Sequence, residues 1–185
     1  MRYRQLSAAN YVKNRENFIK QMEPGSLAVF HSNDILPTNA DGHMPFHQNA
    51  DLFYMCGVDQ EESVLVIFPD ASDKKQREIL FLKETNDEIA IWEGAKLNKA
   101  QALEVSGIKT VYWNSDFDTV MKSLMSQANN VYLNANEHLR ATIEVETREV
   151  RMNELLRETY PIHTYKRSGP IMHRLRSIKS DEEVQ

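Results

Sequence analysis

The sequence contains little of what the common covalent or metal-based catalytic sites need. It has one cysteine, Cys56, in 185 residues, which excludes a disulfide within the chain and a zinc site built on cysteines. Gly-rich phosphate loops, Gly-x-Ser-x-Gly turns and His-Glu-x-x-His motifs are all absent from the sequence. Taken alone, the chain offers no complete active site, and its cysteine content favours the reducing cytoplasm.

Long apolar runs and an excess of positive charge are missing as well. No run approaches the roughly 20 residues that a bilayer-spanning helix needs, and the first residues lack the apolar stretch of a secretory signal. The 22 Lys and Arg residues against 27 Asp and Glu leave a net charge of −5, which gives no electrostatic reason to bind nucleic acid. We therefore expect neither a membrane nor a nucleic acid as a partner.

The first half of the chain predicts one helix, one buried strand and a long loop before a group of strands. Apolar residues at helical spacing predict a helix over 7–22 with Ser7 as its N-cap. A short apolar run predicts a strand over 26–31, and the Pro- and Asn-rich residues 32–50 predict a loop. Three strand candidates at hairpin-length spacing then predict an antiparallel meander: residues 51–56, 63–68 and 78–83.

Strands and helices alternate in the second half. The expected elements are a helix over 98–106, a strand over 110–113, a helix over 116–127 and a strand over 130–134. The charged residues 136–159 permit a helix, with 144–158 as its solvated face, and a further helix is expected over 170–178. This alternation predicts an α/β fold: a mixed, mainly central β-sheet flanked by helices.

The last residues encode the start of a helix. Ser180 followed three residues later by Glu183 fits a capping box, and acidic residues in a first helical turn suit the helix dipole. A capped start without a helix body behind it predicts that these residues come from a longer polypeptide. A frayed polar terminus is the alternative.

The densest polar segment lies between Asp41 and Asp51 and contains His43 and His47. Imidazole and carboxylate groups suit zinc, manganese or iron, but Pro45 between the two histidines opposes the helix that would bring both rings to one face. We therefore favour a structured loop over a metal site. Cys56 lies in an apolar segment, where a thiol acts as a small hydrophobic group rather than a nucleophile.

Trp92 precedes Glu93 and Gly94 at an expected turn. An exposed tryptophan there would be an anchor for a partner, because tryptophan is enriched where interfaces bind most strongly. The alternative is a core tryptophan that closes one end of the sheet. The residue type alone leaves both open.

Four segments carry a resemblance to a known family. The helix that contains Arg15 is followed by Met22-Glu-Pro-Gly-Ser26, and a central signature runs from Thr38-Asn-Ala-Asp41 to Gly57; the other two segments are Ile91-Trp-Glu-Gly-Ala-Lys-Leu97 and Leu175-Arg-Ser-Ile-Lys-Ser-Asp-Glu-Glu183. In order and spacing they resemble the N-terminal domain of the Xaa-Pro aminopeptidases (aminopeptidase P), within the creatinase and prolidase group. His47 stands where the family usually has Arg, and an imidazole can keep a hydrogen bond but not a permanent charge.

The resemblance implies a domain of the creatinase N-terminal type, with a ribonuclease H-like motif, over residues 1–168. Residues 169–185 would then be a linker and the truncated start of a metallopeptidase catalytic domain of the pita-bread fold. That catalytic domain would hold two manganese ions, so we expect no metal, no catalytic residue and no activity in these 185 residues. By the same resemblance Asp41, His47 and Trp92 are the substrate-gating and interface residues, and Trp92 matches a tryptophan that approaches a partner's substrate pocket.

The implied partners are a second copy of the chain, in a homodimer or homotetramer, and peptides with proline at the second position. Two alternatives remain. One is the N-terminal domain of a prolidase, which cleaves Xaa-Pro dipeptides. The other is a non-enzymatic protein-binding module, since the same fold occurs in a histone chaperone subunit. The sequence that encodes the metal ligands would distinguish the enzyme from the module.

Overall fold

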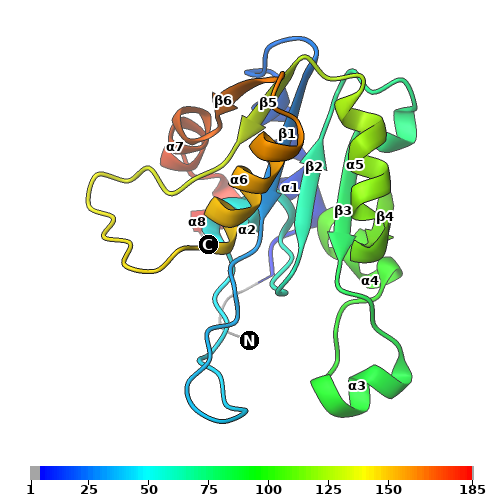
Figure 1. Ribbon diagram of the computed structural model, residues 1–185, viewed down its shortest axis with the longest axis vertical. Coiled ribbons are helices and arrows are strands. Elements are labelled where there is room, and N and C mark those ends of the chain that lie inside the picture. The colour runs from blue at the N-terminus through cyan, green and yellow to red at the C-terminus, as the bar shows by residue number, and fades with distance from the viewer. Residues whose placement is uncertain (1–4, 185) are drawn as a thin grey trace.

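A computed structural model describes residues 5–184, which fold around one six-stranded sheet (Figure 1). The strand order is β4-β3-β2-β1-β5-β6. Strand β2 pairs antiparallel with both of its neighbours, and the other three pairs are parallel. Five strands therefore point the same way, which confirms the predicted mixed sheet. The strands are β1 (Ser26–His31), β2 (Val64–Ile67), β3 (Glu78–Leu82), β4 (Thr110–Trp113), β5 (Asn130–Leu133) and β6 (Thr164–Arg167).

Helices cover both faces of the sheet (Figure 1). The α-helices are α1 (Ala8–Ile19), α2 (Ala50–Cys56), α3 (Asp87–Glu93), α4 (Lys99–Ser106), α5 (Phe117–Met125), α6 (Arg148–Thr159), α7 (Gly169–Ser177) and α8 (Asp181–Val184). Because successive strand residues face opposite ways, Ala28 and Phe30 join a core cluster with α1, α2, α4 and α7. Leu27 and Val29 join a second cluster with α5 and α6 on the other face.

The predicted strand over residues 51–56 is wrong, because this segment is helix α2. The Asn49 side chain caps the helix by accepting hydrogen bonds from the backbone N–H groups of Asp51 and Leu52, at 3.0 and 3.2 Å. Leu52, Met55 and Cys56 are buried at helical spacing. The three-strand meander is therefore reduced to β2 and β3, which do pair antiparallel.

Further differences occur where the elements bury few apolar side chains. Helix α6 begins only at Arg148, so residues 136–147 form a loop rather than helix. Strand β6 was not predicted, since its sequence Thr-Tyr-Lys-Arg is polar and it lies at the edge of the sheet. Helix α3 was not predicted either, and none of its residues is buried.

The predicted helix start at Ser180 is confirmed. The backbone N–H of Ser180 donates to the carboxylate of Glu183 at 2.8 Å, and the backbone N–H of Glu183 donates to the Ser180 hydroxyl at 3.3 Å. These reciprocal bonds form a capping box at the start of α8. Gln185 lies outside the described residues.

A buried arginine joins the helical layer on one face to the sheet. The Arg15 side chain on α1 has no exposed surface, and its Nη1 donates to the carbonyl groups of Met55 and Ser106 at 2.8 and 3.0 Å. Its Nε pairs with Glu78 at 3.1 Å. One guanidinium thus binds the end of α2, the end of α4 and the start of β3 at the same time.

The glycine that ends α2 gives the first prediction. Gly57 has a positive φ of 69°, and a Cβ added there would lie 2.3 Å from the ring of the buried Tyr11. Gly57→Ala should lower the free energy of unfolding by about 3 kcal/mol, from backbone strain and overpacking together. Urea unfolding measures this change.

Gly25→Ala is the matched control. Gly25 has the same φ of 69°, but the close contact of the added Cβ would be with the amide nitrogen of the Asn129 side chain, at 2.9 Å, and this amide can turn away. We expect a loss of about 1 kcal/mol from the backbone alone. Equal losses for the two variants would contradict the packing argument.

Candidate functional site

Three long connections emerge from one edge of the sheet. They are residues 32–49 after β1, residues 83–98 after β3 and residues 134–147 after β5. Since β1, β3 and β5 run in the same direction, their carboxyl ends share this edge, which is where open α/β sheets bind ligands. Figure 1 shows the loop after β1 and helix α3 as two separate projections at this end.

Asp41 lies at the tip of the first projection, the loop 32–49. Pro37 and His43 form an isolated antiparallel bridge, and the backbone N–H of Thr38 donates to the carbonyl of Gly42 at 2.9 Å. The turn that these contacts close presents Asp41 to solvent. His43 and His47 therefore lie in a loop and share no helix. The structured loop expected from the sequence is confirmed.

His47 lies at the base of the same loop, which is tied to the body of the domain. The Asn33 side chain donates to the carbonyl of His47 at 2.9 Å. The Gln48 side chain donates to the carbonyl groups of Val58 and Gln60 at 3.0 and 2.8 Å. The base is held by amide side chains, so the position of the Asp41 tip depends on bonds made at its base.

Trp92 lies on α3, the second projection, and 88% of its surface is exposed. The neighbouring Ile91 is 76% exposed. The helix is capped by Asn86 and held to the end of β3 by an ion pair of 2.7 Å between Lys83 and Glu93. The alternative that Trp92 is a core residue is therefore wrong, and the hypothesis of an exposed tryptophan is confirmed.

A groove of about 400 Å³ lies between the loop 32–49 and the loop 134–147. Its apolar lining includes Leu36, Met44 and Val145, and His47 also lines it. The predicted site residues are thus divided: Asp41 and His47 share one loop, with His47 at the groove, and Trp92 lies on the other projection.

The sequence did not predict a buried polar cluster behind the groove. The Asn134 amide donates to Asp51 at 3.0 Å and to Glu149 at 2.7 Å, and Arg176 pairs with Asp51 at 2.7 Å. Glu149 is only 4% exposed, although the sequence placed it on a solvated helix face. The position of Asn134 directly after a buried strand was the one available signal.

His31, at the end of β1, is a further buried polar residue that the sequence did not single out. It is 1% exposed, and neither ring nitrogen has a hydrogen-bond partner among the described residues. Burial, together with the nearby charge of Arg148, lowers the pKa of His31 to about 3. The ring is therefore neutral at physiological pH and does not act as a general acid there.

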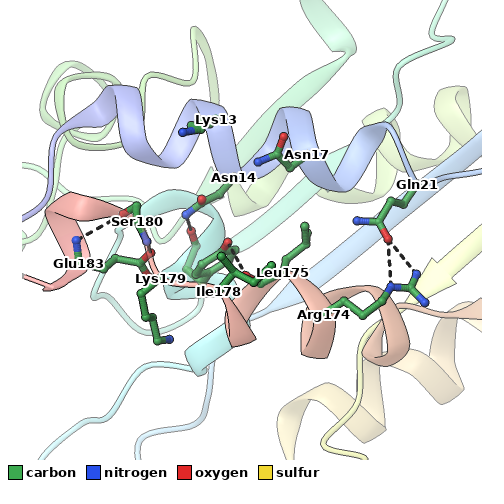
Figure 2. A pocket seen from close by; sticks show the side chains of 11 residues that line it. Lys13, Asn14, Asn17, Gln21, Arg174, Leu175, Ile178, Lys179, Ser180 and Glu183 are labelled. Carbon is green, nitrogen blue, oxygen red and sulfur yellow. Dashed lines mark hydrogen bonds between the residues drawn. The ribbon is translucent and has the colours of Figure 1, made fainter.

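A second hollow, of about 340 Å³, lies between α1 and the terminal helices α7 and α8 (Figure 2). Figure 2 shows Gln21, just after α1, facing Arg174 of α7, and the guanidinium donates to the Gln21 side-chain oxygen at 2.8 Å. Asn14 donates to the carbonyl of Tyr54 at 2.9 Å. Amide and cationic side chains hold these helices together, and none of Asp41, His47 and Trp92 lines this hollow.

Neither a metal centre nor a reactive thiol is found in the part of the chain that the structure describes. Among residues 5–184 no group of three or more His, Cys, Asp and Glu side chains could hold a metal ion. Cys56 is fully buried, and burial raises the pKa of its thiol to about 11. The thiol is therefore protonated at neutral pH, which confirms that Cys56 is a core residue. Across residues 5–184, every helix is too short or too polar to cross a bilayer.

Comparison with known proteins identifies the family. A family model described as the aminopeptidase P N-terminal domain matches residues 11–132. The Xaa-Pro aminopeptidase of Escherichia coli is 26% identical over 182 residues, which are 97% of this chain and 41% of that protein. Intermediate cleaving peptidase 55 of Schizosaccharomyces pombe is 21% identical over 180 residues, 97% of this chain and 37% of that protein.

Solved structures agree with this result. The low pH form of Escherichia coli aminopeptidase P matches with a TM-score of 0.76 at 26% identity, over 98% of this chain and 41% of that one. The Pseudomonas aeruginosa aminopeptidase PepP shares the fold, with a TM-score of 0.80 at 20% identity over 97% of this chain and 40% of that one. The fold is that of aminopeptidase P N-terminal domains. The chain belongs to the aminopeptidase P N-terminal domain family, and it spans about two fifths of the length of the E. coli relative.

The exposure of Trp92 gives the second prediction. Trp92→Ala in this chain should change the free energy of unfolding by less than about 0.5 kcal/mol, because an exposed side chain contributes little to packing. Trp113→Ala is the comparison, since Trp113 packs against the core and its loss should cost about 2 kcal/mol. Urea unfolding at one pH measures both. A large loss for Trp92→Ala would show that α3 supports the fold.

Proposed function

We propose that this domain gates the substrates of a proline-specific metallo-aminopeptidase and helps to assemble the enzyme. The enzyme removes the first residue from peptides with proline at the second position. The observation that carries the proposal is Trp92: it is 88% exposed on a projection of a domain whose relatives include Xaa-Pro aminopeptidases. A tryptophan with most of its surface exposed is suited to contact a substrate or a second subunit.

The loop 32–49 supplies the second part of the gate. Asp41 is an exposed carboxylate at its tip, and a carboxylate at the entrance to a cleft attracts the positively charged amino terminus of a peptide. His47 lines the groove at the base where the family usually has Arg. The domain then limits which peptides enter and holds their amino ends, while the bond is cleaved elsewhere.

The metal ions of the proposed enzyme, two manganese ions by family resemblance, are held by residues that do not belong to this chain. The donor sets available among residues 5–184 do not fit a metal ion. A pair of metal ions supplies a metal-bound hydroxide and stabilises the developing oxyanion. Residues 1–168 then form the N-terminal domain, and 169–185 lead into the catalytic part. Alone, the chain is expected to cleave nothing.

A second copy of the chain is the proposed partner, in a homodimer or homotetramer. The exposed apolar side chains of Ile91 and Trp92 would lose water-exposed surface on reaching another subunit, which favours association. The proposed location is the reducing cytoplasm, which suits a buried Cys56 with no second cysteine in the chain.

The third prediction tests the gate in the full-length enzyme. Trp92→Ala should lower kcat/KM for Xaa-Pro-Yaa tripeptides about tenfold, the equivalent of one lost contact of about 1.4 kcal/mol. Metal content should stay unchanged, since Trp92 is not a metal ligand in this proposal. Initial rates with manganese present, together with metal analysis of the purified protein, measure both quantities.

Ile162→Ala is the control, because Ile162 is an apolar residue that is 95% exposed. It lies in the turn before β6, at the amino end of that strand and away from the end of the sheet that carries Trp92. Unchanged kinetics for Trp92→Ala would remove the gating role. Two other outcomes would identify the alternatives to an aminopeptidase. Cleavage of Xaa-Pro dipeptides alone identifies a prolidase, and no metal-dependent cleavage of either substrate identifies a binding module.

A further inference from the structure

One short turn lies between the two projections. Residues 58–62, which we call the mounting turn, precede β2. Strand β2 runs antiparallel to both of its neighbours, and its first residue, Val64, pairs with His31 of β1 and with Phe81 of β3. The start of β2 is therefore at the same edge of the sheet as the ends of β1 and β3. The mounting turn lies between the strands from which the two projections emerge.

Gln48 binds both ends of the first projection to the mounting turn. Its side-chain nitrogen donates to the carbonyl groups of Val58 and Gln60 at 3.0 and 2.8 Å. Its side-chain oxygen accepts from the backbone N–H groups of Asn49 at 2.8 Å and of Asn33 at 3.4 Å. A side-chain amide has two donor hydrogens and one oxygen with two acceptor positions. All four positions of this amide are occupied, and each of them by the backbone.

The mounting turn also holds the second projection where the chain returns from α3. The side-chain oxygen of Gln60 accepts a hydrogen bond from the backbone N–H of Leu97 at 2.8 Å. Glu61 forms an ion pair with Lys96, and the two side chains are only 8% and 16% exposed. A buried charge that loses its partner is strongly destabilising. This pair therefore fixes the returning chain against the turn.

The start of the second projection is close to the same turn. The carboxylate of Glu62 lies 3.8 Å from the Lys83 ammonium, which also pairs with Glu93 of α3. Glu62 has a φ of 55°, a left-handed conformation that residues other than glycine rarely adopt. Such a conformation persists where the surrounding contacts determine it. Three consecutive residues of the turn thus contact both ends of the second projection, while α3 between these ends buries none of its residues.

We propose that the mounting turn couples the two projections, and that Gln48 and Gln60 are the positioning residues that set the Asp41 loop relative to the helix of Trp92. Gln60 makes the link, because its carbonyl binds Gln48 and its side chain binds Leu97. A shift of this one residue disturbs both contacts. The coupling concerns the domain alone, and its role in substrate selection rests on the proposed function.

Gln48→Ala gives the fourth prediction, measured by hydrogen exchange on this chain. The amide of Leu97 binds Gln60 rather than Gln48, yet its protection should fall about fivefold, because the turn loses the bonds that hold it from the other side. In the reverse direction, Gln60→Met keeps the side-chain volume and removes the acceptor. It should lower the protection of the Asn49 amide, which binds Gln48, by about the same factor.

Gln127→Ala is the matched control. Gln127 is also half-buried and also joins two segments, since it accepts from the Ser72 N–H and donates to the Ser123 carbonyl, both at 3.0 Å. Its loss should leave Leu97 unchanged. The amide of Val66, within β2, is the internal reference, because a general loss of stability would lower its protection too. A fall at Leu97 that is absent, or no larger than that at Val66, overturns the coupling.

The fifth prediction concerns positioning in the full-length enzyme. Gln48→Ala should raise KM for Xaa-Pro-Yaa tripeptides about fivefold and leave kcat unchanged, because Gln48 positions the gate and touches no reacting bond. Partial unfolding would instead lower the apparent kcat at constant KM. Combined with Trp92→Ala, the effect on kcat/KM should be smaller than the product of the two single effects, since both changes act on one gate. Initial rates measure these quantities.

The outcomes separate the coupling from the proposed function. An unchanged KM for Gln48→Ala, together with a lowered kcat/KM for Trp92→Ala, overturns the positioning role. Unchanged kinetics for Trp92→Ala contradict the gate itself, and the exchange of the Leu97 amide then decides the coupling alone. Should Gln48→Ala fail to fold, Gln60→Met decides by the protection of Asn49 relative to Val66.

Discussion

The buried guanidinium of Arg15 is the contact on which the rest of this domain depends. It binds carbonyl groups in the last turns of α2 and α4 and the side chain of Glu78 at the start of β3. Removing a charge from water is costly unless its hydrogen bonds are replaced. A fully buried arginine therefore requires these elements to meet in one arrangement. That requirement fixes the end of α2, and with it the position where the loop 32–49 returns to the sheet.

The sequence predicted the sheet well where burial and strand pattern agree. The apolar runs at 26–31 and 63–68 are buried strands because their residues face helices on both sides. Residues 51–56 have the same apolar composition, yet they form α2. A short apolar run does not distinguish a strand from a buried helix by periodicity, and here the Asn49 cap and the left-handed Gly57 decide the outcome.

The candidate site could be predicted only in part, for a related reason. Asp41, His47 and Trp92 were found because they lie in segments that resemble a family, and the structure places them on two projections from one edge. Glu149 was missed because its neighbours are charged and exposed, while its own side chain points to Asn134, a residue 15 positions away in the sequence. Contacts of that kind depend on how β5 and α6 pack, which no local pattern records.

The two projections differ in how they are held, and the difference bears on function. Helix α3 buries none of its residues and is tied to β3 by the Lys83 ion pair with Glu93, so Trp92 has freedom to adapt to whatever it contacts. The loop 32–49 is held at its base by Asn33 and Gln48, and at α6 by Asp34. In the proposed gate, the adaptable Trp92 would meet the partner at one side, and the fastened acidic loop would keep a fixed entrance at the other. The two projections lie at one end of the sheet because β1 and β3 run in the same direction, and only strands that end at the same edge bring their loops to one surface.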